Sequence, residues 1–77
     1  MPDILVLGPG CSKCQMLYER TKQAAQELGL TCEVFKVTEI NAIVGFGVMS
    51  TPALIVDGTI KVQGRVPTLA QLKEMLS

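Results

Sequence analysis

The fold of this chain is decided by the stretch ILVLGPGCSKC, which runs from Ile4 to Cys14. Its first four residues form a continuous apolar run, typical of a short strand buried on both faces. The Gly-Pro-Gly sequence of residues 8–10 then predicts a sharp turn. Apolar and small residues recur at helical spacing after the turn, at Cys14, Leu17, Tyr18, Thr21, Ala24, Ala25 and Leu28. The stretch therefore predicts a strand, a turn and a long helix, for which Gly29 is a left-handed C-terminal cap.

The middle of the chain contains a second strand and a short helix. Residues Thr31–Val37 include valine and phenylalanine, which favour a strand, and also charged residues that leave it partly exposed. Thr38 is a candidate N-cap for a short helix from Glu39 to Val44. Glycines in the segment Gly45–Gly47 end that helix, because each glycine costs about 1 kcal/mol in a helix relative to alanine.

The last third of the chain predicts a hairpin followed by a helix. Ala53–Val56 is an apolar strand, and the Asp57–Gly58 pair favours a two-residue turn in which both residues have positive φ. Thr59–Gln63 is then the antiparallel return strand, and Gly64 breaks it. Pro67 is expected in the first turn of the closing helix, where its missing N–H is harmless. The inner stripe of that helix consists of Leu69, Leu72 and Leu76.

The predicted order is strand, helix, strand, helix, strand, strand, helix. Two strands joined by a helix are expected to be parallel, with a right-handed crossover. We therefore expect an α/β fold, a four-stranded mixed sheet with helices on both faces. The length of 77 residues indicates one domain over residues 1–77.

Composition restricts the function classes. Hydrophobic residues make up 48% of the chain, and seven basic residues balance seven acidic ones. Without a basic field we expect no nucleic-acid partner and no membrane surface partner. No histidine is present, which excludes histidine bases and histidine metal ligands. The apolar run near the amino terminus is too short for a signal peptide or a membrane span, so we expect a cytoplasmic, monomeric protein.

The three cysteines point to redox chemistry rather than to a disulfide-stapled fold. Cys11 and Cys14 are spaced Cys-x-x-Cys after a strand and at the start of a helix, the context that a redox motif requires. Unpaired N–H groups and the helix dipole stabilise a thiolate there, and the thiolate is the nucleophile. Cys14 lies one turn further, on the apolar face, and is expected to be more buried. Cys32 is expected to be a buried apolar residue, and a regulatory thiol is the alternative.

A metal carrier is the competing interpretation of the same motif. The Gly10–Cys14 segment also resembles the copper-binding loop of heavy-metal-associated domains, where soft thiolates hold Cu(I). Those domains follow the order strand, helix, strand, strand, helix, strand, whereas this chain is predicted to end on a helix. A structural zinc site needs four ligands, and three cysteines without histidine do not supply them. No metal and no other cofactor is therefore predicted.

A second motif favours the redox interpretation. Thr51 and Pro52 precede the strand Ala53–Val56. Together with the Cys-x-x-Cys helix, this arrangement resembles the thioredoxin and glutaredoxin family, in which a cis-proline begins the third strand beside the redox pair. The resemblance covers nearly the whole chain and is closest to very small, redox-active disulfide proteins. It implies that Cys11 attacks, that Cys14 resolves, and that Thr51 and Pro52 bind the substrate.

The resemblance also implies partners. Disulfide-containing protein substrates are reduced by exchange, which needs no cofactor, and an external reductase or thiol donor resets the protein. Glutaredoxins carry a glycine–aspartate segment that grips glutathione, but this chain has Gly64-Arg65-Val66 there, without an acid. Lys13 either stabilises a thiolate or is an ordinary exposed residue. Met49 and Phe46 form an apolar rim for substrates or pack in the ordinary way.

Overall fold

The computed structural model describes residues 3–10, 12–30 and 33–76 of the chain. Its elements follow the predicted order and are the strands β1 (Ile4–Leu7), β2 (Val34–Val37), β3 (Ala53–Val56) and β4 (Thr59–Gln63), and the helices α1 (Ser12–Glu27), α2 (Ile40–Gly45) and α3 (Leu69–Leu76). β1, β3 and β4 have the bounds predicted from the sequence. β2 is shorter than predicted at its start, because Glu33 lies outside the strand; residues 31 and 32 lie outside the described part.

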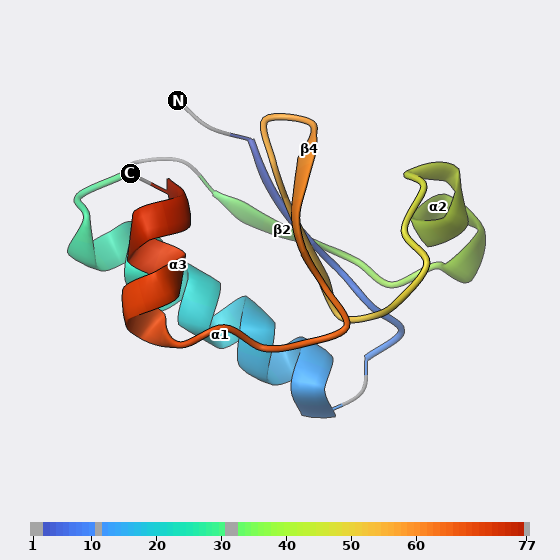
Figure 1. Cartoon of the computed structure of the whole chain (residues 1–77), viewed down its shortest axis with the longest axis horizontal. Coiled ribbons are helices and arrows are strands. Elements are labelled where there is room, and N and C mark those ends of the chain that lie inside the picture. Colours follow the sequence, from blue (N-terminus) through green and yellow to red (C-terminus); the bar gives the residue numbers. More distant parts are fainter. Residues whose placement is uncertain (1–2, 11, 31–32, 77) are drawn as a thin grey trace.

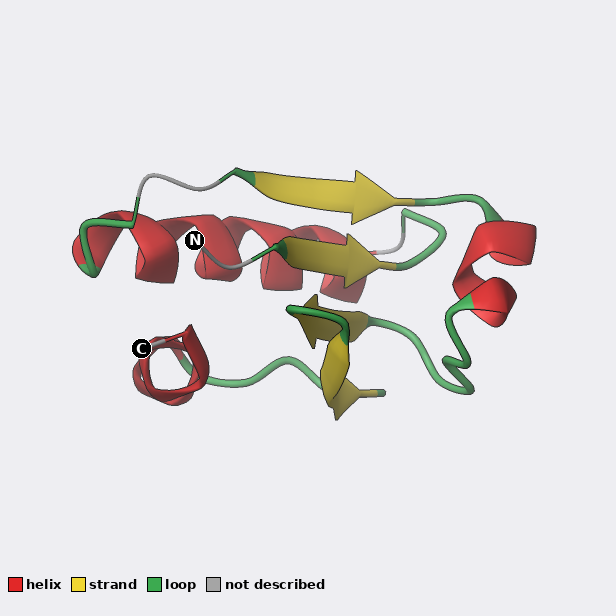
Figure 2. Cartoon of the chain, turned by 90° about the horizontal axis from the view of Figure 1, so that it is seen from above, coloured by secondary structure: helices red, strands yellow, loops and turns green. Residues whose placement is uncertain are grey.

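The four strands form one mixed sheet in the order β2-β1-β3-β4. β1 is parallel to β2 and antiparallel to β3, and β3 is antiparallel to β4. Figure 2 shows the arrows of β1 and β2 pointing the same way, with β3 running against them. Asp57 and Gly58 both have positive φ, 52° and 79°, as the predicted two-residue turn requires. The expectation of a four-stranded mixed α/β sheet is thus confirmed.

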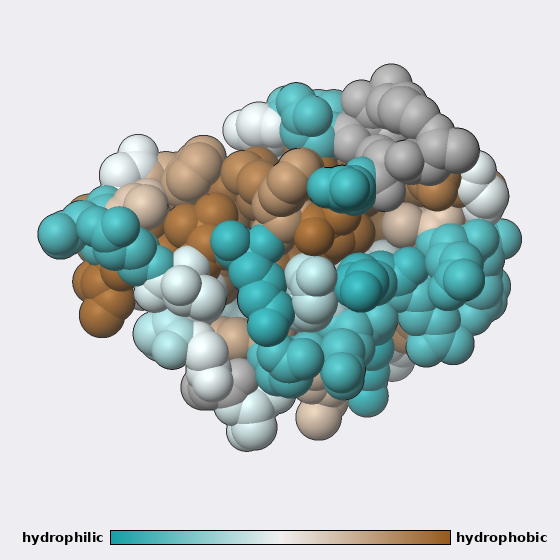
Figure 3. Space-filling view, turned by 180° about the vertical axis from the view of Figure 1, so that it is seen from behind, coloured by the Kyte–Doolittle hydropathy of each residue, from teal (hydrophilic) through white to brown (hydrophobic). Residues whose placement is uncertain are grey.

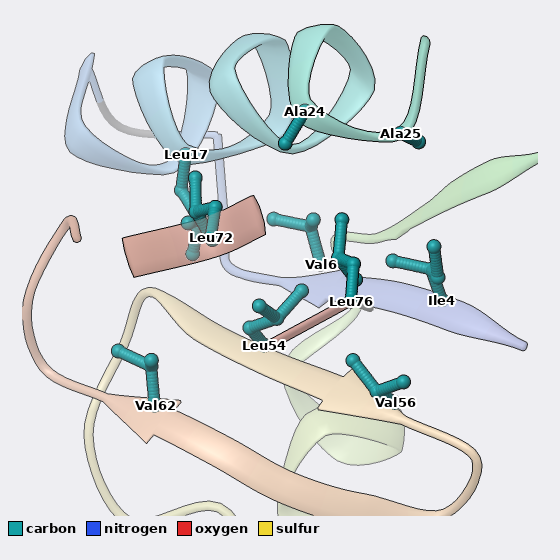
Figure 4. Packing of buried hydrophobic residues seen from close by; sticks show 10 residues of the cluster. All are labelled: Ile4, Val6, Leu17, Ala24, Ala25, Leu54, Val56, Val62, Leu72 and Leu76. Carbon is teal, nitrogen blue, oxygen red and sulfur yellow. The ribbon is translucent and has the colours of Figure 1, made fainter. Parts of the chain in front are cut away.

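One face of the sheet is covered by α1 and α3, which lie next to each other in Figure 1. Alternate strand residues point to this face because successive side chains in a strand face opposite sides. The buried cluster between the helices and the sheet consists of Ile4, Val6, Leu17, Ala24, Ala25, Leu54, Val56, Val62, Leu72 and Leu76. Figure 4 shows the α1 side chains directed towards those of the strands and α3. This cluster is the main core of the protein.

The opposite face carries the short helix α2. A smaller buried cluster forms there from Leu7, Ile43, Val48, Ala53 and Ile55. Because α2 has only six residues, part of this face stays uncovered, and Phe35 on β2 is 53% exposed. Seen from behind, hydrophobic side chains gather over the sheet and around α2, and hydrophilic ones follow α1 (Figure 3). Helices therefore lie on both faces, as expected, but they cover them unequally.

The C-terminal end of α1 has the predicted glycine cap, but Leu28 lies outside the helix. Gly29, with a φ of 72°, donates its N–H to Gln26 O, and Leu30 donates to Ala25 O. These two bonds make the Schellman cap that the glycine predicted. Leu28, expected on the inner stripe, follows the last helical residue and is 36% exposed.

In the part of the chain that the structure describes, no helix has the length and apolar character needed to cross a membrane.

The starts of the other two helices differ from the predictions. The N-cap of α2 is Glu39 rather than Thr38, and it makes no side-chain capping bond. Pro67 does not enter the first turn of α3. Thr68 caps this helix instead: its Oγ1 accepts from the N–H of Gln71, and its own N–H donates to Gln71 Oε1. This reciprocal pair is a capping box, which satisfies two backbone donors at once.

Candidate functional site

Of the two cysteines in the predicted redox motif, the structure describes Cys14, which lies at the start of α1. Cys14 stands in the first turn of the helix and is only 5% exposed, in agreement with its predicted place on the apolar face. Cys11 precedes the helix directly in the sequence and lies outside the described residues, as does Cys32. Lys13, between the two motif cysteines, is exposed to solvent. The first turn of α1 contains no acidic residue, which leaves its positive end uncompensated.

The sheet register brings the second predicted motif next to Cys14. Leu7, the last residue of β1, pairs with Ala53, the first residue of β3. Gly8, which follows β1, and Pro52, which precedes β3, therefore lie at the same end of the sheet. A Cβ placed on Gly8 would lie 2.2 Å from Cys14 Sγ and 3.9 Å from Pro52 Cα. The thiol of Cys14 and the Cα of Pro52 thus both lie near Gly8.

The Thr51–Pro52 peptide bond is cis, the isomer that the family resemblance implies. Pro52 is buried, whereas Thr51 is exposed beside it. The carbonyl of Pro52 accepts a hydrogen bond of 2.8 Å from the N–H of Gly64 at the end of β4. Gly64 has a φ of 76°, a conformation that glycine adopts at little cost. The backbone of the proline is therefore tied to the end of β4 by Gly64.

An open hollow lies on the solvent side of this motif. It has a volume of about 220 Å³ and is lined by Pro9, Ile40, Ile43, Val44, Val48, Met49 and Thr51. Met49 is 93% exposed, and its backbone N–H donates to Gln63 Oε1 at 2.9 Å. Met49 therefore lies at the exposed edge of this mostly apolar hollow. Phe46, named with it, is 45% exposed and is not among the residues that line the hollow.

A second, narrow recess has Cys14 in its lining. It is lined by Val6, Gly8, Gly10, Cys14, Gln15, Lys36 and Thr38. Lys36 Nζ donates to Gln15 Oε1 at 2.7 Å and lies 4.6 Å from the centre of the Tyr18 ring. The recess therefore places a cationic side chain among the walls around the buried thiol. Lys36 has no local signal in the sequence, because only the parallel pairing of β2 with β1 brings it close to α1.

Within residues 3–10, 12–30 and 33–76, no group of three or more His, Cys, Asp or Glu side chains is gathered in a way that suits a metal ion. The order of elements ends on the helix α3 and not on a strand. The chain therefore does not have the strand–helix–strand–strand–helix–strand order of heavy-metal-associated domains.

The fold and the site together define a class of protein. A mixed sheet in the order β2-β1-β3-β4, with a Cys-x-x-Cys sequence at the start of its first helix and a cis-proline before β3, is a thioredoxin-like fold. A solved structure of thioredoxin-2, described as a component of the malaria parasite protein secretion machinery, agrees with it. The two match with a TM-score of 0.68 at 18% identity, over 97% of this chain and 82% of the other.

Sequence comparison identifies the family. The family model described as "Thioredoxin domain" matches residues 2–77. The chain is 39% identical over 77 residues to a thioredoxin of Methanothermobacter thermautotrophicus, with 100% of both chains covered. It is 40% identical over 76 residues to a thioredoxin of Methanocaldococcus jannaschii, covering 99% of this chain and 87% of the other. The chain belongs to the thioredoxin family, a family of oxidoreductases.

Proposed function

We propose that this protein is a thiol–disulfide oxidoreductase that reduces disulfides in protein substrates, with Cys11 and Cys14 as its dithiol. The Cys11 thiolate attacks one sulfur of the substrate disulfide, and the other substrate sulfur leaves as a thiolate. Cys14, after losing its proton to solvent, attacks Cys11 Sγ. The mixed disulfide breaks, the substrate departs reduced, and the protein keeps a Cys11–Cys14 disulfide. A single observation carries this proposal: the buried Cys14 thiol in the first turn of α1 lies at Gly8, the residue near which Pro52 also lies.

The hollow beside Thr51 supports a protein substrate. Its lining is mostly apolar and it is open to solvent, with Met49 almost fully exposed at its rim. Exposed apolar surface of this kind marks interaction sites. In the proposal, backbone groups of Thr51 align an extended substrate segment by strand-like hydrogen bonds. Thr51 and Pro52 are accordingly the substrate-binding residues.

An external reductase or thiol donor completes the proposed cycle. The Cys11–Cys14 disulfide must receive two electrons to return to the dithiol, and this chain holds no group predicted to supply them. A cytoplasmic setting suits the proposal, since reductants there keep thiols reduced. We further propose that residues 1–77 act as one thioredoxin-like domain.

The proposal is tested by insulin reduction with dithiothreitol. The wild-type protein is expected to accelerate the reaction, and Cys11→Ser is expected to abolish the acceleration because the attacking thiolate is gone. Cys14→Ser is expected to accumulate an insulin adduct on Cys11 that mass spectrometry identifies. An adduct on Cys14 or Cys32 would contradict the assigned roles. Copper or zinc retained at one equivalent through purification, with no insulin reduction, would favour the metal-carrier alternative.

A further inference from the structure

The backbone of Gly8 is fixed at the end of β1. Gly8 is buried, and its N–H donates to the carbonyl of Val37 at 2.9 Å, which extends the pairing of β1 with β2. The preceding residue, Leu7, pairs with Val37 on one side and Ala53 on the other. Because both neighbouring strands hold this segment, the backbone at Gly8 has little freedom to move away from a crowded neighbour.

The space at Gly8 is filled by the thiol of Cys14. A Cβ at this position would lie 2.2 Å from Cys14 Sγ and 2.9 Å from Cys14 Cβ. Both distances are far shorter than the contact of about 3.5–4.0 Å that non-bonded heavy atoms prefer. Gly8 is not among the glycines with positive φ, unlike Gly10 with 94°. Its lack of a side chain is therefore needed for space and not for backbone conformation.

We propose that Gly8 is a positioning residue for Cys14. Without a side chain at residue 8, the Cys14 sulfur lies against the end of β1 and near Pro52, and this is the position from which it attacks Cys11 Sγ. This inference rests on the proposed function, because it concerns the second step of the exchange. In that step the Cys11–substrate bond breaks, the Cys11–Cys14 bond forms, and the substrate leaves as a thiolate.

A methyl group at residue 8 should separate the two steps of the reaction. Cys14 Sγ must rotate or its helical turn must shift, since the strand backbone is held by Val37. The second step depends on Cys14, and a displacement of about 1 Å slows such a step by about 100-fold. The first step needs only the Cys11 thiolate and the incoming disulfide. Gly8→Ala is therefore expected to slow resolution while leaving the first attack unchanged.

The test uses Ellman's reagent, a symmetric aromatic disulfide, and stopped-flow absorbance. A Cys32→Ala background leaves two thiols, so one coloured thiolate is released by attack of Cys11 and a second by attack of Cys14. In Gly8→Ala the second phase is expected to slow by about 10- to 100-fold, with the first phase unchanged. Gly45→Ala is the matched control, because a Cβ there meets nothing within 4 Å. Both phases of this control should equal those of the parent.

The outcomes separate this inference from the proposed function. A parent that never releases the second thiolate overturns the proposed roles and, with them, the role of Gly8. A biphasic parent with equal phases in Gly8→Ala overturns the role of Gly8 alone. If Gly8→Ala does not fold, the double variant Gly8→Ala/Cys14→Gly should fold, because both Cys14 atoms that crowd the new methyl, Sγ and Cβ, are gone. A double variant that also fails to fold contradicts the inference.

Discussion

Thr21 lies in the middle of α1 with its side chain in the core, fully buried. Its Oγ1 has no hydrogen-bond partner, and no other buried side-chain oxygen or nitrogen among the described residues is left unpaired in this way. An unsatisfied buried hydroxyl costs about 1–3 kcal/mol. Valine has nearly the same shape and no polar atom, so Thr21→Val is expected to raise the free energy of unfolding by about 1 kcal/mol. Thermal unfolding should show a midpoint higher by about 4–8 °C.

The matched control for that substitution is Thr21→Ser. Serine keeps the hydroxyl and loses the methyl group, which leaves a small cavity and lowers the stability. A decrease in the melting temperature of Thr21→Val would show that the threonine hydroxyl stabilises the folded protein more than the valine methyl does.

Gln63 fixes the segment that precedes the cis-proline. Its side chain is exposed and accepts a hydrogen bond from the backbone N–H of Met49 at 2.9 Å. Gln63→Ala releases Met49 from β4, so we expect the KM for insulin to rise by about two- to tenfold, the range that corresponds to one hydrogen bond. The melting temperature should change little because the bond is exposed. Gln26→Ala, on the surface of α1, is the control, and an equal rise in its KM would exclude a specific role for Gln63.

At the scale of elements, an ion pair joins the last turn of α1 to α3. Lys73 Nζ contacts the carboxylate of Glu27, which also accepts a hydrogen bond from Gln23. The bond from Lys73, and secondarily that from Gln23, holds the pKa of Glu27 below its ordinary value of 4.5. A lowered folded-state pKa means that the pair contributes stability above pH 4.5 and that this contribution is lost as the pH falls through the folded-state pKa.

Urea unfolding over a pH series tests this linkage. Glu27→Gln is expected to be slightly less stable than wild type at neutral pH, since an exposed pair contributes little. The difference should shrink as the medium becomes acidic, because wild-type Glu27 then becomes neutral too. Lys73→Gln is expected to show a similar pH-dependent loss, and the double variant should lose less than the sum of both. A difference that persists unchanged in acid would mean that the ion pair is not its cause.

The sequence predicted correctly the bounds of those strands that are marked by local sequence features, an apolar run or a two-residue turn. β1 and β3 are uninterrupted apolar runs, and the Asp57–Gly58 turn fixes where β3 ends and β4 begins. The predicted starts of α2 and α3 were wrong, because several neighbouring residues compete to cap a helix. At α3 the reciprocal bonds of Thr68 and Gln71 determined the outcome, and Pro67 stayed outside.

The sequence also predicted the main residues of the candidate site, but not the contacts that surround them. The sequence singled out Cys14, Thr51 and Pro52, and the pairing of β1 with β3 brings Cys14 and Pro52 together. The contacts of Gly8 and Gln63 were not foreseen. Gly8 meets Cys14 across a turn, and Gln63 meets Met49 across 14 residues of chain. Such contacts depend on the packed structure, for which a single sequence carries no local pattern.

At the scale of the whole molecule, the main core and the candidate site occupy different regions. The core lies between the sheet and the pair α1 and α3, as Figure 4 shows. The site lies at the end of the sheet where β1 leads into α1 and Pro52 leads into β3, with α2 beside it. The exposed rim of the hollow can therefore vary without disturbing the core. This arrangement suits a protein whose stability margin is thin, as in any domain of this size.

Two substitutions should show that separation. Leu54 is fully buried in the core, whereas Met49 is 93% exposed. Leu54→Ala is expected to cost about 2–5 kcal/mol, out of a total of about 4–12 kcal/mol for 77 residues. It should lower the melting temperature by more than about 10 °C. Met49→Ala removes apolar surface that is already in water, so the melting temperature should stay the same while the KM for insulin rises.

The comparison depends on measuring both variants by both methods, thermal unfolding and insulin reduction. Well below its melting temperature, Leu54→Ala should retain the wild-type KM, because the hollow and the cysteine motif are built from other residues. If Leu54→Ala raises KM as much as Met49→Ala does, the site is coupled to the main core. If Met49→Ala lowers the melting temperature, Met49 contributes to packing and the apolar rim is not a separate docking surface. Wild-type stability with a raised KM for Met49→Ala is the result that an exposed substrate-binding side chain requires.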